Sequence, residues 1–194
     1  KASVTDIVHK SDETKYQFTS KPEFMNDGGM SAAGRGTSTH KFMQFCDYEM
    51  ASVSVKDECD RLYESGYLTL EESNAVNISA VETFFSSNLY TRIKKSPLVK
   101  KEMNFLSEFP ANFVHKELSS NFHDEKIIVQ GVLDCYFLTP DGAVIVDYKT
   151  DRVSSEQVLV ERYSLQLRLY SAAFEKIRNQ KVKEAYLYSF GLGR

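Results

Sequence analysis

The feature that most constrains the fold is a pair of apolar, β-branched segments, residues 126–138 and 143–149, which only a short connection separates. The connecting residues, Thr139-Pro140-Asp141-Gly142, are typical of a tight turn. This pattern predicts a β-hairpin.

The register of this hairpin decides which polar residues can meet. A turn centred between Pro140 and Asp141 pairs residues whose numbers sum to 281, and this sum places Asp134 opposite Asp147. Opposed residues of an antiparallel pair share a face, with Cβ atoms roughly 4.5–5.5 Å apart. Lys149 lies two residues beyond Asp147 and therefore projects from the same face. Two carboxylates so placed can share a hard cation such as Mg²⁺.

Two alternatives stay open for these residues. A three-residue loop with a bulge at Gly142 would shift the register by one and turn Asp134 away from Asp147. The acids could also be solvated charges at strand ends, with Lys149 paired to one of them. The apolar sequence around both acids argues against simple solvation. Carboxylates on opposite faces of the hairpin would rule out a shared cation.

The rest of the chain predicts helices before the hairpin and one long helix after it. Helices are expected from a start at Ser3 or Thr5 and over residues 36–50, 57–66, 69–85, part of 86–97, and 155–179. Strands are expected over residues 99–105, 112–117 and 182–190, and residues 11–35 are expected to form a loop. This order predicts an α/β or α+β fold in one domain, residues 1–194.

Composition narrows the functional classes. The net charge of −3 argues against a protein that coats nucleic acid non-specifically, although it leaves room for a local basic groove. The densest basic run consists of Arg92, Lys94, Lys95, Lys100 and Lys101. This run is either a solvated face or a contact to the DNA backbone, and the second alternative predicts binding that weakens as salt rises.

Several kinds of site are not expected. The three cysteines, Cys46, Cys59 and Cys135, form no CxxC pair, so we expect no disulfide framework, zinc site or iron–sulfur cluster. Residues 29–35 half-resemble a phosphate loop but lack its lysine and a preceding strand, so we expect no ATP site. The sequence has no run long enough for a membrane helix and no signal peptide, and a cytoplasmic protein without a membrane partner is expected. The absence of an initiator Met favours a piece of a longer chain.

In combination, three segments resemble the RecB-like nuclease family of the PD-(D/E)XK superfamily. They are Gly-Val-Leu-Asp at 131–134, Asp-Tyr-Lys-Thr-Asp at 147–151, and residues 163–170 with their Gln-Leu-x-x-Tyr pattern. Residues 36–40 are similar to the family's Gly-x-x-x-His helix motif, and residues 101–105 to its glutamate-bearing strand. Nearly the whole chain is similar to the nuclease domains of AddA-type subunits of bacterial AddAB helicase–nucleases. The resemblance implies a restriction-endonuclease-like core, with a central mixed β-sheet flanked by helices.

The resemblance also implies the roles of individual residues. The ligands of Mg²⁺ or Mn²⁺ would be His40, Asp134, Asp147 and the backbone carbonyl of Tyr148. Lys149 would orient or activate the attacking water and stabilise charge on the phosphate. Glu102 would support the site from outside the ligand set. The side chains on one face of the long helix that would position Lys149 or the DNA strand are Tyr163, Gln166 and Tyr170.

The implied function is metal-dependent hydrolysis of DNA. The substrate would be single-stranded DNA or an unwound duplex end, and AddA-type domains cut the strand that ends in 3′. The implied partners are a helicase portion of the same chain and an AddB-like subunit, in break repair and recombination in a bacterial cytoplasm. One alternative is a free-standing RecB-like exonuclease. The other is an inactive nuclease-like domain that binds DNA or braces a partner; such copies typically lose the acids or the lysine, and here both acids and Lys149 are present.

Overall fold

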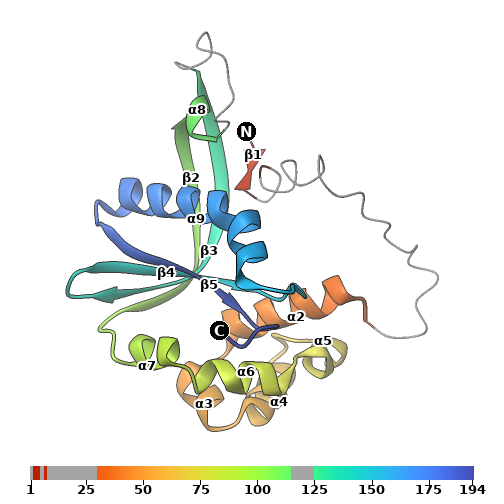
Figure 1. The fold of residues 1–194 in the computed structure, drawn as a ribbon. Helices are drawn as coiled ribbons and strands as arrows, with labels where there is room; N and C mark the ends of the chain where they lie inside the picture. The colour runs from red at the N-terminus through yellow and green to blue at the C-terminus, as the bar shows by residue number, and fades with distance from the viewer. Residues whose placement is uncertain (1, 5–6, 8–29, 115–124) are drawn as a thin grey trace. The chain divides into compact units, whose positions relative to one another are not determined.

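The computed structural model describes residues 2–4, 7, 30–114 and 125–194, and its contacts divide the chain into two compact units (Figure 1). Unit 1 comprises Lys1–Phe18, Pro97–Asp147 and Ser154–Leu187. Unit 2 comprises Thr19–Ser96, Tyr148–Val153 and Tyr188–Arg194. One of the boundaries between the units falls within the second strand of the predicted hairpin, between Asp147 and Tyr148.

Unit 1 is built on a mixed sheet with β3 (Lys126–Thr139) at its centre. Strand β3 pairs antiparallel with β2 (Val99–Pro110) along nearly all its length, and with β4 (Gly142–Lys149) at its C-terminal end. Strand β1 (Ala2–Ser3) pairs with it in parallel, which makes the sheet mixed. Strand β5 (Val182–Ser189) adjoins β4.

The hairpin has the predicted register. The pairs run from Cys135 with Val146 to Thr139 with Gly142, and every pair sums to 281. Pro140 and Asp141 are left as a two-residue turn, closed by a hydrogen bond of 2.8 Å from the Thr139 hydroxyl to the carbonyl of Gly142. The alternative bulged turn at Gly142 is therefore wrong.

Helix α9 (Glu156–Arg178) lies across the sheet of unit 1 (Figure 1). It buries an apolar stripe of side chains. The ring of Phe174 packs edge-on against that of Tyr136 at 4.8 Å between centroids. Tyr170 packs in the same way on Phe105 at 5.6 Å. The long helix was predicted correctly to within a residue or so at each end, because a 3.6-residue periodicity sustained over many turns is a strong signal.

Gly131, the first residue of one family-like segment, has a packing role. It pairs across the sheet with Phe105. A Cβ atom on Gly131 would lie 2.7 Å from the Cζ atom of the Phe105 ring, which is too close for any real side chain. The glycine therefore lets the aromatic ring cross the sheet backbone and reach Tyr170 on α9.

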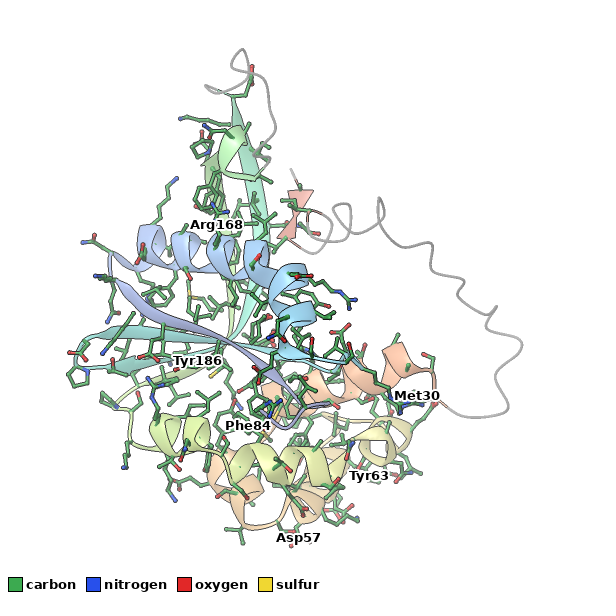
Figure 2. All side chains as sticks on the ribbon, in the orientation of Figure 1. Met30, Asp57, Tyr63, Phe84, Arg168 and Tyr186 are labelled. Carbon is green, nitrogen blue, oxygen red and sulfur yellow. The ribbon has the colours of Figure 1, made fainter. Side chains whose placement is uncertain are left out.

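Unit 2 contains a group of short helices (Figure 1). Their aromatic side chains form a core. The helices are α2 (Ala32–Phe45), α3 (Tyr48–Val53), α4 (Val55–Glu64), α5 (Leu70–Ala75), α6 (Ile78–Phe85) and α7 (Asn88–Lys94). Phe84, labelled in Figure 2, is fully buried at the centre of this core. Its ring contacts those of Tyr148 and Tyr188, so the ends of β4 and β5 are anchored in unit 2.

Two helices predicted as continuous are each divided in the structure. The helix expected over residues 36–50 is α2 and α3, because the Asp47 side chain accepts hydrogen bonds from the backbone of Glu49 and Met50 and starts a new helix. Asn77 caps α6 in the same way and separates it from α5. The capping box predicted at Thr69 and Glu72 is confirmed.

Other boundaries also differ from the prediction. Residues 112–114, expected in a strand, belong to the short helix α8 (Ala111–Val114), because Pro110 ends β2 and Ala111 turns away to bond the carbonyl of Glu125 at 2.8 Å. Residues 115–117 lie outside the described part. Residues 32–35 of the expected loop are helical, since Ser31 caps α2, and residues 11–29 are not among those described. Ser3 ends strand β1, and the described residues that follow it, Val4 and Ile7, are helical, which agrees with a helix start at this point.

Within the described residues, none of the helices has both the length and the apolar character needed to cross a membrane.

Candidate functional site

Three acidic residues occupy one row of the unit 1 sheet. Continuing the β3–β4 register by one residue beyond Cys135 and Val146 brings Asp134 opposite Asp147. On the other side of β3, Lys101 pairs with Cys135 and Met103 with Leu133, so Glu102 stands opposite Asp134. Extended in this way, the two registers would put Glu102, Asp134 and Asp147 in one row on three adjacent strands.

Asp147 is the most deeply buried of the three acids, with 1% of its surface exposed. The side-chain amide of Gln166 donates a hydrogen bond of 3.2 Å to Oδ1 of Asp147 and another of 2.8 Å to the hydroxyl of Tyr170. Both N–H groups of the amide are thus used, which fixes its orientation. Helix α9 thereby holds the carboxylate of Asp147 in place from above the sheet.

The pKa of the Tyr170 phenol is affected by all three acids. Burial raises its pKa most, and the negative charges of Asp147, Asp134 and Glu102 raise it further because each disfavours a phenolate. Tyr170 therefore stays a neutral hydroxyl at any pH near neutrality. Tyr163 lies buried on the same helix, one turn before Gln166. The predicted face of α9 is thus present, and it contacts Asp147 through Gln166.

Glu102 has an unusual backbone. Its φ angle is +55°, in the left-handed region that costs a non-glycine residue roughly 1–2 kcal/mol. The distortion falls at the row that contains Asp134 and Asp147. Strain of this kind persists only where surrounding structure imposes it, and it is concentrated at functional sites.

Tyr148 and Lys149 belong to unit 2, where they point in opposite directions. The ring of Tyr148 is buried in the aromatic core and its hydroxyl lies 2.7 Å from that of Tyr48. Because side chains alternate along a strand, anchoring Tyr148 turns Lys149 to the other face. Lys149 is also buried, with 9% of its surface exposed, which is unusual for a lysine.

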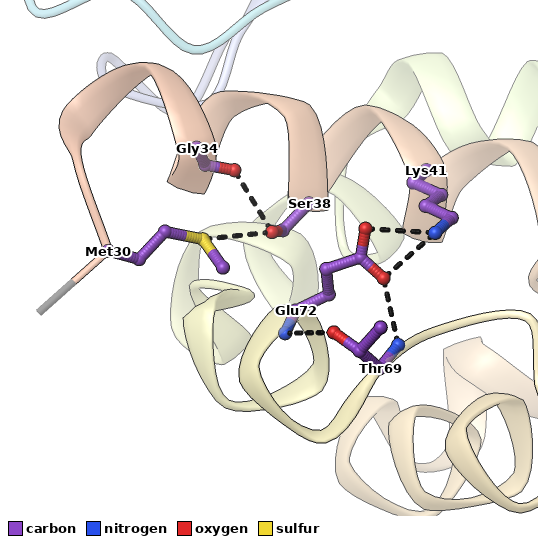
Figure 3. A network of polar contacts seen from close by, with 6 residues as sticks. All are labelled: Met30, Gly34, Ser38, Lys41, Thr69 and Glu72. Atoms are coloured by element: carbon purple, nitrogen blue, oxygen red, sulfur yellow. Dashed lines mark hydrogen bonds and ion pairs between the residues drawn. The ribbon is translucent and has the colours of Figure 1, made fainter.

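His40 lies on α2 of unit 2 and is half-buried. The neighbouring Lys41 donates hydrogen bonds of 2.8 Å to both carboxylate oxygens of Glu72, as Figure 3 shows. Glu72 also closes the capping box of α5 with Thr69, so one carboxylate joins two helices. This network fixes the α2 segment that carries His40.

The donors available in these positions suit a hard divalent cation. Carboxylate oxygens are the ligands that Mg²⁺ and Mn²⁺ prefer, and a buried carboxylate such as Asp147 needs a compensating positive charge. Across residues 2–4, 7, 30–114 and 125–194, no three His, Cys, Asp or Glu side chains converge closely enough to form a metal site by themselves. Among the described residues, the acids do not converge on one point. The predicted ligand set therefore stays a prediction.

Sequence reasoning missed two residues that shape the site. Tyr48, which fixes Tyr148, had no signal, because its partner is a hundred residues away. Thr150 contacts α2 at Gly36. A glycine inside a helix is a signal of such close approach, since alanine would make the more stable helix.

Comparisons with known proteins agree with this architecture. A model of the PD-(D/E)XK nuclease superfamily matches residues 14–192. Two Clostridium botulinum proteins, each named as a subunit of an ATP-dependent helicase/nuclease, are 38% and 37% identical over 99% of this chain. A Clostridium perfringens protein of the same name is 34% identical over 98% of it. In each case the chain spans only 16% of the relative's length.

The family match extends across both compact units, and the mixed sheet with flanking helices agrees with the fold expected of that superfamily. The resemblance seen in the sequence, to this superfamily and to AddA-type subunits, is confirmed. The chain belongs to the PD-(D/E)XK nuclease superfamily.

Proposed function

We propose that this chain hydrolyses phosphodiester bonds of DNA with the help of a divalent cation. The observation that carries the proposal is the environment of Asp147. This carboxylate is buried and held by Gln166, and a buried lysine follows it two residues later. It lies one residue beyond the last observed pair of the predicted register, which would put it opposite Asp134. A structural role alone would not require two acids in one row of an apolar sheet, where like charges repel.

We propose Mg²⁺ or Mn²⁺ as the cation. Its ligands are the residues matched to the family motifs, namely His40, Asp134, Asp147 and the backbone carbonyl of Tyr148. When bound, the cation would polarise the attacking water and neutralise charge on the phosphate oxygens. Asp134 and Asp147 would supply carboxylate oxygens as ligands from the sheet. His40 lies on α2 and is the histidine of the Gly-x-x-x-His motif.

The protein's own groups have separable roles in this proposal. Lys149 orients the attacking water and stabilises negative charge that builds on the phosphate, and its burial strengthens that electrostatic effect. Gln166, oriented by Tyr170, holds the carboxylate of Asp147. Glu102 supports the row of acids from β2, and Tyr163 lies buried on α9 one turn before Gln166.

The substrate and partners follow from the relatives' names. Because the relatives are named as helicase/nuclease subunits, we propose that the substrate is single-stranded DNA produced by unwinding. We propose that the chain is an exonuclease that acts on the strand ending in 3′. The chain would then act with a helicase portion and an AddB-like partner, during break repair and recombination in a bacterial cytoplasm. The relatives are much longer than this chain, which supports the proposal that the chain acts within a larger assembly.

The test is digestion of end-labelled single-stranded DNA with Mg²⁺ and with EDTA. We expect cleavage that EDTA abolishes, and losses on the order of 10²- to 10⁴-fold in Asp147→Ala and Lys149→Ala. Lys56→Gln is the matched control, because Lys56 is an exposed lysine paired with Asp60 on its own helix. A wild-type protein that binds DNA but stays inert with every divalent cation would instead indicate an inactive, DNA-binding domain.

A further inference from the structure

Helix α2 makes an unusually close contact at Gly36. A Cβ atom on Gly36 would lie 2.6 Å from Oγ1 of Thr150 and 3.7 Å from its Cβ. Real Cβ atoms essentially never approach another atom closer than 3.0 Å. A residue with a Cβ atom at position 36 would therefore force either α2 or the Thr150 side chain to shift.

The contact joins two segments that carry proposed functional residues. Gly36 and His40 lie four residues apart on α2, so they share a face of the helix. Thr150 directly follows Lys149, whose carbonyl accepts a hydrogen bond of 2.9 Å from the backbone N–H of Phe190. All five residues belong to unit 2, so the distance between the helix and the strand end is defined within one compact body.

A second glycine of the same helix provides a comparison. A Cβ atom on Gly34 would lie 2.5 Å from Cγ of Met30, an equally close approach. Methionine is unbranched and flexible, so its side chain can move aside. Threonine is β-branched and stiff, and it has no such freedom. Of these two glycines, only Gly36 faces a rigid neighbour that would resist an added methyl group.

We propose that Thr150 is a positioning residue. Seated against Gly36, it sets the distance between His40 on α2 and Lys149 at the end of β4. This inference rests on the proposed function for the roles of His40 and Lys149. It also gives a physical reason for the glycine of the Gly-x-x-x-His motif, which leaves room for the residue after the lysine.

The first test reads the position of His40 without catalysis. Ring resonances of His40 are recorded by NMR in the wild type, Gly36→Ala, Gly34→Ala, Thr150→Ala and the double variant Gly36→Ala/Thr150→Ala. We expect Gly36→Ala to shift them, Gly34→Ala to leave them unchanged, and the double variant to restore them. In the double variant the new methyl group occupies the space that the threonine hydroxyl leaves.

The second test uses the same variants in DNA cleavage. We expect Gly36→Ala to lower kcat at least about tenfold and to raise the Mg²⁺ concentration at half-maximal rate, with KM for DNA little changed. The double variant should return to within about threefold of Thr150→Ala. Thermal unfolding reports whether each variant is folded.

Distinct outcomes separate this inference from the proposed function. If Gly36→Ala behaves as Gly34→Ala, or the double variant is no better than Gly36→Ala, Thr150 does not position His40. If the wild type cleaves no DNA with any divalent cation, the proposed function fails. The NMR comparison then still decides whether the contact controls His40.

Discussion

At the scale of single residues, alternation along β4 determines which side chains are available for chemistry. Tyr148 is fixed in the aromatic core of unit 2 by its ring contacts and by Tyr48. Asp147 and Lys149 must then point the other way. The sequence was sufficient to predict this pattern, because strand alternation is a local rule. It was not sufficient to identify Tyr48, because that contact depends on tertiary packing.

Glu102 yields a prediction at this scale. Glu102→Gly should stabilise the fold by about 1 kcal/mol, because glycine adopts a φ of +55° without strain. The same variant should cleave DNA more slowly, since it loses the carboxylate of the row. Thermal unfolding and digestion rates measure the two effects, with Glu102→Gln as the control that keeps the strain.

Loss of stability in Glu102→Gly would contradict the strained backbone at this position. Unchanged cleavage would contradict a supporting role for Glu102. No sequence rule predicts that a glutamate within a strand adopts the left-handed backbone conformation, because glycine and asparagine adopt it more readily. The similarity of residues 101–105 to a family strand was the only sign in the sequence that Glu102 mattered.

At the scale of elements, strong periodic signals were predicted well and single capping residues were not. The hairpin and α9 follow from patterns repeated over many residues. The divisions at Asp47 and Asn77 each depend on one side chain that starts a new helix. The Thr69 capping box was found because it has two members at a fixed spacing.

The Lys41–Glu72 pair predicts a pH dependence of stability. The pKa of Glu72 lies below its ordinary value, first because Lys41 donates hydrogen bonds to it and then because the backbone N–H of Thr69 does. A carboxylate with a lowered pKa stabilises the fold above its unfolded-state pKa, and that contribution is lost as pH falls through the folded-state pKa. The pair is partly exposed, so its contribution should stay below about 1 kcal/mol.

Chemical unfolding of the wild type and Glu72→Gln across acid pH measures this effect. The difference in unfolding free energy should be largest near neutrality and shrink as pH falls below about 4.5, the ordinary value for Glu72. Lys41→Met should show the same trend, because it removes the other partner. A difference that stays constant with pH would show that the ion pair contributes nothing.

At the scale of the whole molecule, the chain builds two compact bodies by crossing between them several times. This division was not predicted, because it depends on contacts between segments far apart in the sequence. The family match nevertheless extends over both units. The chain spans only 16% of the relatives' length, and it is the proposed function that assigns DNA delivery to a helicase portion.

The basic residues of α7 predict how DNA binding depends on salt. Lys94 and Lys95 are exposed near the end of this helix. If both contact phosphates, replacing both with glutamine should lower affinity for single-stranded DNA and reduce the salt slope by about 0.7 per lysine. Fluorescence anisotropy in EDTA, which prevents cleavage, measures the slope. An unchanged slope would mean that this face is merely solvated.

The proposed site depends above all on Asp134 and Asp147 holding a divalent cation. Titration of Mn²⁺ followed by electron paramagnetic resonance tests it most directly, because it needs neither DNA nor a helicase. We predict saturable binding by the wild type that weakens at least about tenfold in both Asp134→Asn and Asp147→Asn, with Asp60→Asn unchanged. Equal binding by the wild type and both hairpin variants would contradict the account.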